Sequence, residues 1–85
     1  MYEFLVTDDF RDSLKKLDSQ VQRDIKNKLK FLASTENPLL FSKKLKGYKN
    51  IFRFRCGDFR IVFQLKGKTI LLLLVKHRKE IYEGF

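Results

Sequence analysis

Cysteine, histidine and proline are scarce in this sequence of 85 residues, which holds one of each and no tryptophan. A single cysteine excludes an intramolecular disulfide and a cysteine-based metal cluster, and it is typical of a protein from a reducing compartment. With one histidine and few acidic residues in the second half, a zinc site and a Ser-His-Asp triad are out of reach or nearly so. We therefore expect no metal and no cofactor.

Long hydrophobic runs are missing as well. The longest, residues 70–75, is far below the roughly 18 residues that a membrane span needs. The first residues have neither the basic nor the apolar region of a signal peptide, so we expect a soluble, cytoplasmic protein without a membrane segment. A hydrophobic content of 44% and an aromatic content of 14% argue strongly against disorder. The length allows a single domain, residues 1–85.

The formal charge of +9 comes entirely from the second half of the chain. Seven basic residues balance seven acidic ones in residues 1–42, whereas residues 43–85 hold twelve basic and three acidic residues. A solubilising surface usually mixes both signs, as the first half does. The asymmetry favours a polyanion, such as a nucleic acid, as the partner of the second half.

The first half has the pattern of a strand followed by two helices. Residues 2–6 are typical of an edge strand, and Thr7 or Asp8 then offers a helix N-cap. Apolar residues follow at helical spacing in two groups: Phe10, Leu14 and Leu17, then Val21, Ile25, Leu29 and Leu32. We expect an αα-hairpin that ends at Asn37 and Pro38. Residues 39–45 form a connector without an assignable pattern.

The second half alternates with the period of β-strands. One strand covers residues 48–56, the Gly57-Asp58 pair is a hairpin signal, and a second strand covers residues 59–65. Gly67 marks another turn, and residues 70–75 indicate a third strand that is buried on both faces. Residues 80–85 form a short terminal helix or tail. The expected fold is α+β, with an N-terminal strand and the αα-hairpin packed on one face of a mainly antiparallel four-stranded sheet.

Two-residue turns assign every strand residue to a face of the sheet. The first hairpin pairs Arg55 with Arg60, and the second pairs Val62 with Leu73. The face toward the helices then carries Phe52, Phe54, Phe59, Ile61, Phe63, Leu65, Ile70, Leu72 and Leu74. The open face gathers Arg53, Arg55, Arg60 and His77 around Val62, Leu71 and Leu73. Like charges opposite each other cost stability, so we expect the open face to hold an anion, with Arg60 contributing charge rather than packing.

Arginines on an open sheet face suit phosphodiester chemistry. RNA is cleaved when a ribose 2′-OH attacks its own phosphate, which requires a base, an acid and cations for the charged phosphorane. Arginine matches phosphate oxygens and stays charged. His77 titrates near neutrality, although a strand-end histidine that only contacts solvent is an equally good interpretation. Tyr82 serves as a base only where cations lower its pKa from about 10, and otherwise packs back on the sheet.

Three segments together resemble the RelE/ParE toxin superfamily. They are LKG at residues 45–47, IFRFRCGDFRIVF at 51–63 and VKHRKEIY at 75–82, with the spacing RxRxGDxR…HRxxxY. The helical hairpin before an antiparallel sheet fits as well, so the resemblance covers nearly the whole chain. It implies the toxin of a type II toxin–antitoxin system, a RelE-like endoribonuclease that depends on the ribosome. Such a toxin cuts mRNA in the decoding site, inhibits translation and is held inactive by an antitoxin.

Carried over residue by residue, the resemblance makes Arg53 and Arg60 the phosphate-binding and transition-state-stabilising cations. Arg78 matches the catalytic arginine after the last strand, and Tyr82 matches the C-terminal catalytic tyrosine.

This chain departs from the RelE pattern in two places. Ile51 stands where the family has a lysine, and the spacing from the catalytic arginine to the tyrosine is shorter. His77 or Lys49 could fill the gap, and His77 is included among the catalytic candidates. The RNA-binding candidates are Lys43, Lys44, Lys46, Lys49 and Arg55.

Two other functions stay open. The ParE branch inhibits DNA gyrase and needs no nuclease site, and a basic module can bind nucleic acid without chemistry. The RelE branch is favoured by four residues together: Arg60, His77, Arg78 and Tyr82. The expected partners are the ribosome, mRNA and a cognate RelB-like antitoxin whose acidic segment crosses the basic face.

Overall fold

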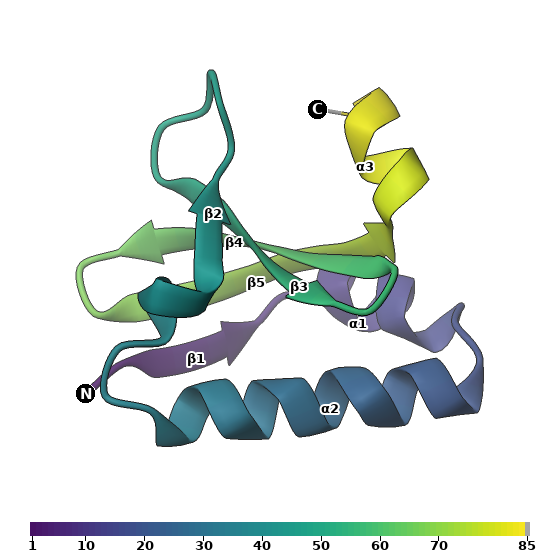
Figure 1. Cartoon of the computed structure of the whole chain (residues 1–85), viewed down its shortest axis with the longest axis horizontal. Helices are drawn as coiled ribbons and strands as arrows, with labels where there is room; N and C mark the ends of the chain where they lie inside the picture. Colours follow the sequence, from purple (N-terminus) through teal and green to yellow (C-terminus); the bar gives the residue numbers. More distant parts are fainter. Residues whose placement is uncertain (85) are drawn as a thin grey trace.

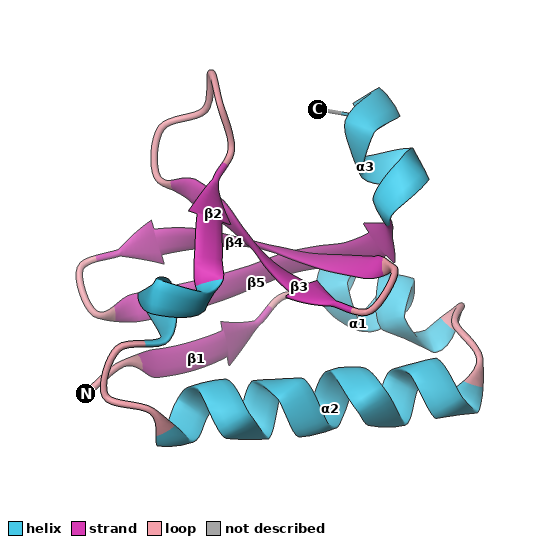
Figure 2. Ribbon diagram, in the orientation of Figure 1, coloured by secondary structure: helices cyan, strands magenta, loops and turns pink. Residues whose placement is uncertain are grey.

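The computed structural model describes the backbone of residues 1–84 and the side chains of residues 1–81. Its elements are, in order, β1 (Glu3–Val6), α1 (Asp8–Lys15), α2 (Ser19–Ser34), a 3₁₀ helix (Pro38–Phe41), β2 (Ser42–Lys44), β3 (Ile51–Cys56), β4 (Phe59–Lys66), β5 (Thr69–His77) and α3 (Arg78–Gly84). Five described strands form one sheet in the order β1-β5-β4-β3-β2 (Figure 1). β1 runs parallel to β5, and the other neighbours are antiparallel. Figure 2 shows α1 and α2 on one side of the sheet, with α3 and the β2–β3 loop on the other.

The helical hairpin forms where the apolar spacing predicts it. Thr7 caps α1, because its Oγ1 accepts a hydrogen bond from the Phe10 N–H at 3.1 Å. The same hydroxyl donates to the Leu72 carbonyl at 2.8 Å and so ties the start of the helix to β5. Phe10, Ile25 and Leu32 point into the core and are buried. The predicted αα-hairpin on one face of the sheet is confirmed.

Phenylalanines of β3 and β4 form the centre of the main core. Phe54 and Phe63 are fully buried and stack with ring centroids 4.3 Å apart, and Phe52 stacks on Phe63 at 5.5 Å. Aromatic pairs of this kind contribute about 0.5–1.5 kcal/mol each beyond the area they bury. The same face also buries Ile61, Ile70, Leu72 and Val75.

The β3–β4 register is the predicted one. Gly57 has a φ of +58°, the left-handed conformation that a tight hairpin needs and glycine adopts without strain. Arg55 pairs with Arg60, and Phe54 pairs with Ile61. The arginines of β3 therefore lie on the face opposite the helices.

The β4–β5 register is one residue away from the prediction over the outer part of the hairpin. The strands pair as expected near their turn, but the register shifts next to Val62. Beyond that point Val62 pairs with Leu74 rather than with Leu73, and Arg60 pairs with Lys76. In a bulge, two residues of one strand oppose one residue of the other, so counting from the turn no longer gives the partner.

The shift places the residues of β5 beyond the bulge on the opposite face from the prediction, and His77 and Leu74 are the two that change the site and the core. His77, which was expected beside the arginines, pairs with Phe59 and lies on the helix side. Leu74, which was expected in the main core, packs near Val62 on the open face.

The connector contains a fifth strand where the prediction had four. Pro38 begins the 3₁₀ helix, and β2 follows it, antiparallel to β3 with Lys43 opposite Arg53. Three residues that include two consecutive lysines show no alternation, so the sequence pattern does not reveal this strand. Lysines also suit an edge strand, because they discourage pairing with another chain.

A second, smaller core lies on the open face. Leu45, Val62 and Ile81 are buried together, and packed around them are Ile51, Leu73 and Leu74. The terminal helix predicted for residues 80–85 is α3, which begins earlier, at Arg78. Ile81 therefore fixes α3 to the sheet. Within the described residues, no helix has the length and apolar character needed to cross a membrane.

Candidate functional site

The open face carries a cavity of about 330 Å³ where β2, β3 and β4 lie side by side. The strands contribute its charge, and the 3₁₀ helix contributes an apolar wall. Its lining consists of Leu40, Phe41, Ser42, Lys43, Arg53, Arg55 and Arg60. Every charged residue in this lining is basic, and the arginine fork matches the oxygens of a phosphate. This arginine cavity is therefore suited to an anion.

Arg60 is held firmly in the cavity. It is only 9% exposed, and its Nη1 donates hydrogen bonds to the carbonyls of Gly57 at 2.9 Å and Phe59 at 3.0 Å. These bonds fix the guanidinium beside the β3–β4 turn and offset part of its repulsion with Arg55. We expected Arg60 to contribute charge and no packing. The absence of a packing role is wrong, because the buried side chain also braces the turn.

The other basic residues of the cavity lie in a second like-charged pair. Lys43 faces Arg53 across β2 and β3, beside the pair of Arg55 and Arg60 across β3 and β4. Arg55 is exposed and Arg53 is half-buried. Cross-strand pairs of like charge raise the free energy of the empty site, and a bound anion relieves it. The predicted gathering of Arg53, Arg55 and Arg60 on one face is confirmed, while their roles stay predictions.

Arg78 lies at the same turn that Arg60 braces. Its backbone N–H donates to the Asp58 carbonyl at 2.7 Å, and its Nε lies 3.8 Å from the Asp58 carboxylate. Both side chains are exposed, so the ion pair itself adds little stability. Arg60 and Arg78 both contact the β3–β4 turn, although Arg78 does not line the arginine cavity. Tyr82 belongs to α3, but its side chain lies outside the described side chains, so its role stays a prediction.

His77 does not join the arginines. Its ring meets the Phe59 ring edge-on with centroids 5.4 Å apart, and its Nδ1 accepts a hydrogen bond from the Lys79 N–H at 3.3 Å. It lines a different cavity, of about 310 Å³, together with residues of α1 such as Ser13 and Lys16. The predicted position of His77 on the basic face is wrong because of the bulge in the β4–β5 pair.

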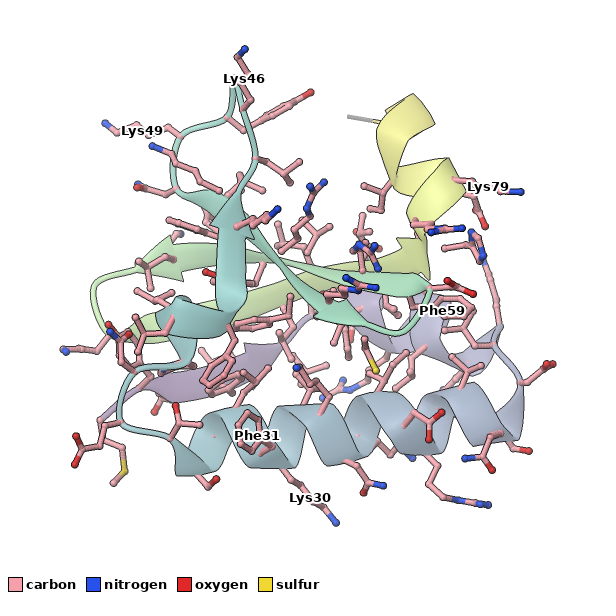
Figure 3. The ribbon with its side chains drawn as sticks, viewed as in Figure 1. Lys30, Phe31, Lys46, Lys49, Phe59 and Lys79 are labelled. Atoms are coloured by element: carbon pink, nitrogen blue, oxygen red, sulfur yellow. The ribbon has the colours of Figure 1, made fainter. Side chains whose placement is uncertain are left out.

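The predicted RNA-binding residues fall into two groups. Lys43 and Arg55 line the arginine cavity. Lys44, Lys46 and Lys49 surround a second depression of about 560 Å³ on the β2–β3 loop. Figure 3 shows Lys46 and Lys49 on the projecting part of this loop. The loop therefore extends the positive surface beyond the sheet.

The apolar residues of these surfaces were not predicted from the sequence. Leu40 and Phe41 line the arginine cavity, and Tyr48 lines the depression on the loop. All three are exposed although they are large and apolar or aromatic. For Leu40 and Phe41 the only available signal was their position in a connector without helical or strand periodicity, because residues outside the core have no periodic partners. Tyr48 was assigned to the predicted strand at residues 48–56, but it lies in the turn before β3.

Cys56 and the acidic residues offer little further chemistry. Burial and then the negative charge of Asp24 raise the pKa of the Cys56 thiol, although Lys28 works against them. The thiol is therefore neutral near pH 7 and a poor nucleophile. Among the described side chains, no group of three or more His, Cys, Asp or Glu residues could hold a metal ion.

The fold and the arginine cavity define a small, basic α+β protein that can hold an anion against one face of its sheet. The family model described as "ParE toxin of type II toxin-antitoxin system, parDE" matches residues 4–82. The chain belongs to this toxin family, within the RelE/ParE superfamily that its motif resembles.

Individual relatives come from the RelE side of the superfamily. A segment of 43 residues is 49% identical to toxin RelE3 of Methanocaldococcus jannaschii; it covers 51% of this chain and 49% of that protein, so the match spans about half the length of the relative. A chain of the RelB-RelE antitoxin-toxin complex from Methanococcus jannaschii has a TM-score of 0.78 and 32% identity, over 95% of this chain and 98% of that one. The RelBE2 toxin-antitoxin complex from Mycobacterium tuberculosis contains a chain with a TM-score of 0.75 and 25% identity, over 91% and 98%. The predicted superfamily and the α+β fold are confirmed.

Proposed function

We propose that this protein is the toxin of a type II toxin–antitoxin system and acts in the cytoplasm as a ribosome-dependent endoribonuclease that cleaves mRNA. The observation that carries the proposal is the arginine cavity, in which Lys43 and three arginines line one site and no acidic residue lies among them. The similarity to proteins named RelE supports the RelE branch over the ParE branch. Cleavage of mRNA in the decoding site would inhibit translation.

The proposed reaction is attack of a ribose 2′-oxygen on the adjacent phosphorus. A 2′-O–P bond forms and the P–O5′ bond breaks, which leaves a 2′,3′-cyclic phosphate and a free 5′-OH. The 2′-OH gives its proton to a base, and the 5′-oxygen takes a proton from an acid. Arg53, Arg55 and Arg60 stabilise the additional negative charge of the phosphorane, and Arg60 is held in position by the turn carbonyls before the substrate arrives.

Proton transfer is assigned to groups at the start of α3. Arg78 lies at the β3–β4 turn, and Tyr82 follows four residues later on the same helix. Arg78 and Tyr82 correspond to the catalytic arginine and the C-terminal catalytic tyrosine of the RelE pattern, which is the basis of this assignment. His77 faces the helices instead, so we do not place the base there.

The proposed partner is a RelB-like antitoxin with an acidic segment over the arginine cavity. Two of the similar structures are toxin-antitoxin complexes, one named RelB-RelE and the other RelBE2. Such a segment blocks RNA phosphates and relieves the like-charged pairs, so it inhibits and stabilises the toxin together. Charge steering is screened within about 8 Å at physiological ionic strength, so the association rate should fall steeply as salt rises. Stopped-flow association at several salt concentrations tests this, and a rate independent of salt would contradict it.

The direct test of the function is cleavage of mRNA on programmed ribosomes. We expect the wild-type protein to cut within the decoding site and Arg55→Ala to cut about 10²–10³-fold more slowly, without a lower melting temperature. Lys66→Ala is the matched control, because Lys66 is an exposed cation at the end of β4 and does not line the cavity. It should cleave like the wild type.

Two other outcomes would assign a different function. A folded protein that leaves mRNA intact but inhibits supercoiling by DNA gyrase would be a ParE-like toxin, as the description of the family model suggests. Salt-sensitive binding of RNA without cleavage would indicate a binding module without chemistry.

A further inference from the structure

We infer that the apolar wall of the arginine cavity binds a nucleobase, and that Phe41 is the residue on which the base stacks. The base belongs to a nucleotide next to the phosphate that the arginines hold. The inference rests on the proposed cleavage of RNA and adds a subsite to it.

Large apolar side chains stand exposed along one edge of the cavity. Leu40 is 77% exposed, Phe41 is 46% exposed, and Phe31 of α2 is 47% exposed. Leu40 and Phe41 line the cavity itself, and Phe31, which is labelled on α2 in Figure 3, packs edge to face against Phe41 with ring centroids 5.2 Å apart. A contiguous exposed apolar patch of this kind marks a binding surface more often than scattered apolar residues do.

The 3₁₀ helix holds Phe41 in place without burying it. Pro38 starts this helix and is itself buried. The Leu40 N–H donates to the Asn37 carbonyl at 3.2 Å, and the Ser42 hydroxyl donates to the Leu39 carbonyl at 2.8 Å. These bonds hold the backbone, and the edge-to-face contact with Phe31 restricts the Phe41 ring, so the ring loses little conformational freedom when a ligand covers it. The exposed surface of Phe41 is therefore preorganised for a flat partner.

Positive charge lies on both sides of the aromatic pair. Inside the cavity are Lys43 and the arginines, and outside it the Lys28 Nζ lies 5.8 Å from the ring centroids of both Phe31 and Phe41. Proteins that bind single-stranded RNA combine cations that follow the backbone with aromatic rings on which bases stack. This cavity contains both parts within one site.

A nucleotide fits the site better than a peptide does. Small-molecule sites have volumes of about 300–1,000 Å³, and the arginine cavity lies at the lower end with about 330 Å³, which suits one nucleotide rather than a helical segment. A nucleotide can cover the Phe41 ring with its base while its phosphate reaches the arginines. An acidic side chain of a partner protein satisfies the arginines only.

The test combines a variant of Phe41 with an mRNA that lacks one base. Ribosomes are programmed with natural mRNA or with mRNA that has an abasic ribose on either side of the cleaved phosphate, and cleavage is followed in single turnover. Loss of stacking on one ring typically lowers affinity by about tenfold to a hundredfold. We expect Phe41→Ala to cleave natural mRNA more slowly than the wild type by that factor. On one of the two abasic mRNAs, the variant should cleave no more slowly than it does on natural mRNA. The wild type should cleave that abasic mRNA more slowly than natural mRNA by the same factor, because the Phe41 substitution and the missing base remove the same contact.

Two control variants separate stacking from other effects. Phe41→Trp keeps an aromatic face and should cleave natural mRNA nearly as well as the wild type. Leu5→Ala removes an exposed apolar side chain from β1, away from the cavity, and should change nothing. Melting temperatures of all variants show whether each remains folded. Unchanged cleavage by Phe41→Ala, or losses that multiply on both abasic mRNAs, would overturn the subsite while leaving the cleavage proposal intact.

A second measurement does not depend on cleavage. An RNA oligonucleotide with the fluorescent base 2-aminopurine reports stacking, and its signal should change on binding to the wild type but not on saturating binding to Phe41→Ala. Binding of RNA by the wild type without this signal would overturn the subsite alone. A wild type that neither binds RNA nor cleaves it would overturn both proposals. If Phe41→Ala weakens only the binding of the antitoxin, the patch serves the partner protein and the subsite is wrong.

Discussion

The two faces of the sheet bury very different amounts of apolar surface. Nine described residues form the main core between the sheet and the helices, whereas the core of the open face consists of Leu45, Val62 and Ile81. The first core contains three fully buried phenylalanines, and the second contains none. Stability therefore depends mostly on the helix face.

The open face instead carries groups that repel one another. Lys43 pairs with Arg53, and Arg55 pairs with Arg60, at positions where apolar side chains would pack better. Natural proteins break the rules of packing and charge pairing mainly where they bind or react. The helix face therefore specifies the fold and the open face specifies the ligand, and variants on each face test that division.

The largest effect is expected on the helix face. Phe54→Ala removes a fully buried ring that stacks on Phe63, and a Phe→Ala change in a core costs about 3–5 kcal/mol. Small domains have roughly 5–15 kcal/mol of stability in total, so the variant should melt far below the wild type. Thermal melting by circular dichroism measures this, with Phe31→Ala as a control of similar chemistry at an exposed site. Equal melting temperatures for Phe54→Ala and the wild type would show that the face assignment is wrong.

A smaller loss of stability is expected from the core of the open face. Ile81→Ala should cost about 2 kcal/mol, at the low end for such a change, because a small core can relax around the lost atoms. Ile81 fixes α3, which carries Arg78, so mRNA cleavage should fall more than the loss of folded protein explains. Cleavage is compared at a temperature where urea titration shows the variant to be folded. Wild-type cleavage under those conditions would contradict a role of the α3 position.

Arg60 should matter for both stability and function, whereas Arg55 should matter for function alone. Arg60→Ala removes the two hydrogen bonds to the carbonyls of Gly57 and Phe59, which should cost about 1–3 kcal/mol. Arg55 is exposed and has a like charge opposite it, so Arg55→Ala should be as stable as the wild type or slightly more stable. Urea unfolding of both variants decides the matter. Equal stabilities for the two variants would mean that the turn does not depend on the guanidinium.

The smallest effect is expected at the exposed pair of Asp58 and Arg78. Asp58→Asn keeps the backbone hydrogen bond from Arg78 and removes only the charge. Exposed ion pairs contribute about 0–1 kcal/mol, and 1 M salt shortens the screening length to about 3 Å. The variant should therefore differ from the wild type by less than about 1 kcal/mol in low salt and not at all in 1 M salt. A larger difference that persists in high salt would show that the carboxylate has a further partner.

Local patterns were enough to predict the parts of the fold that interact with near neighbours in the chain. The helical hairpin follows from apolar residues at helical spacing, with Thr7 as its cap. The β3–β4 pairing follows from Gly57 and from alternation on both sides of it. The arginines of β3 and β4 could be placed on one face for the same reason, since a two-residue turn determines which residues pair.

Other features depend on contacts between distant segments. The bulge beside Val62 changes the face of His77 and Leu74, and it depends on how β5 packs between β1 and β4. β2 exists only because β3 is available to pair with it. Neither the bulge nor β2 has a pattern in the nearby sequence from which it could be predicted.

From the residues alone it follows that this protein has a helical hairpin, a basic hairpin and an excess of positive charge in its second half. Each of these depends on spacing and composition, which are properties of the chain alone. Only the folded structure shows which cations share a site. Lys43 lines the same cavity as the arginines, whereas His77 lies on the other face of the sheet. Arg60 uses some of its hydrogen-bond donors to hold the turn. The folded structure also shows that Phe41 stands at the edge of that site. The physical reason is that pairing register, burial and hydrogen-bond partners are set by segments that meet only after the chain has folded.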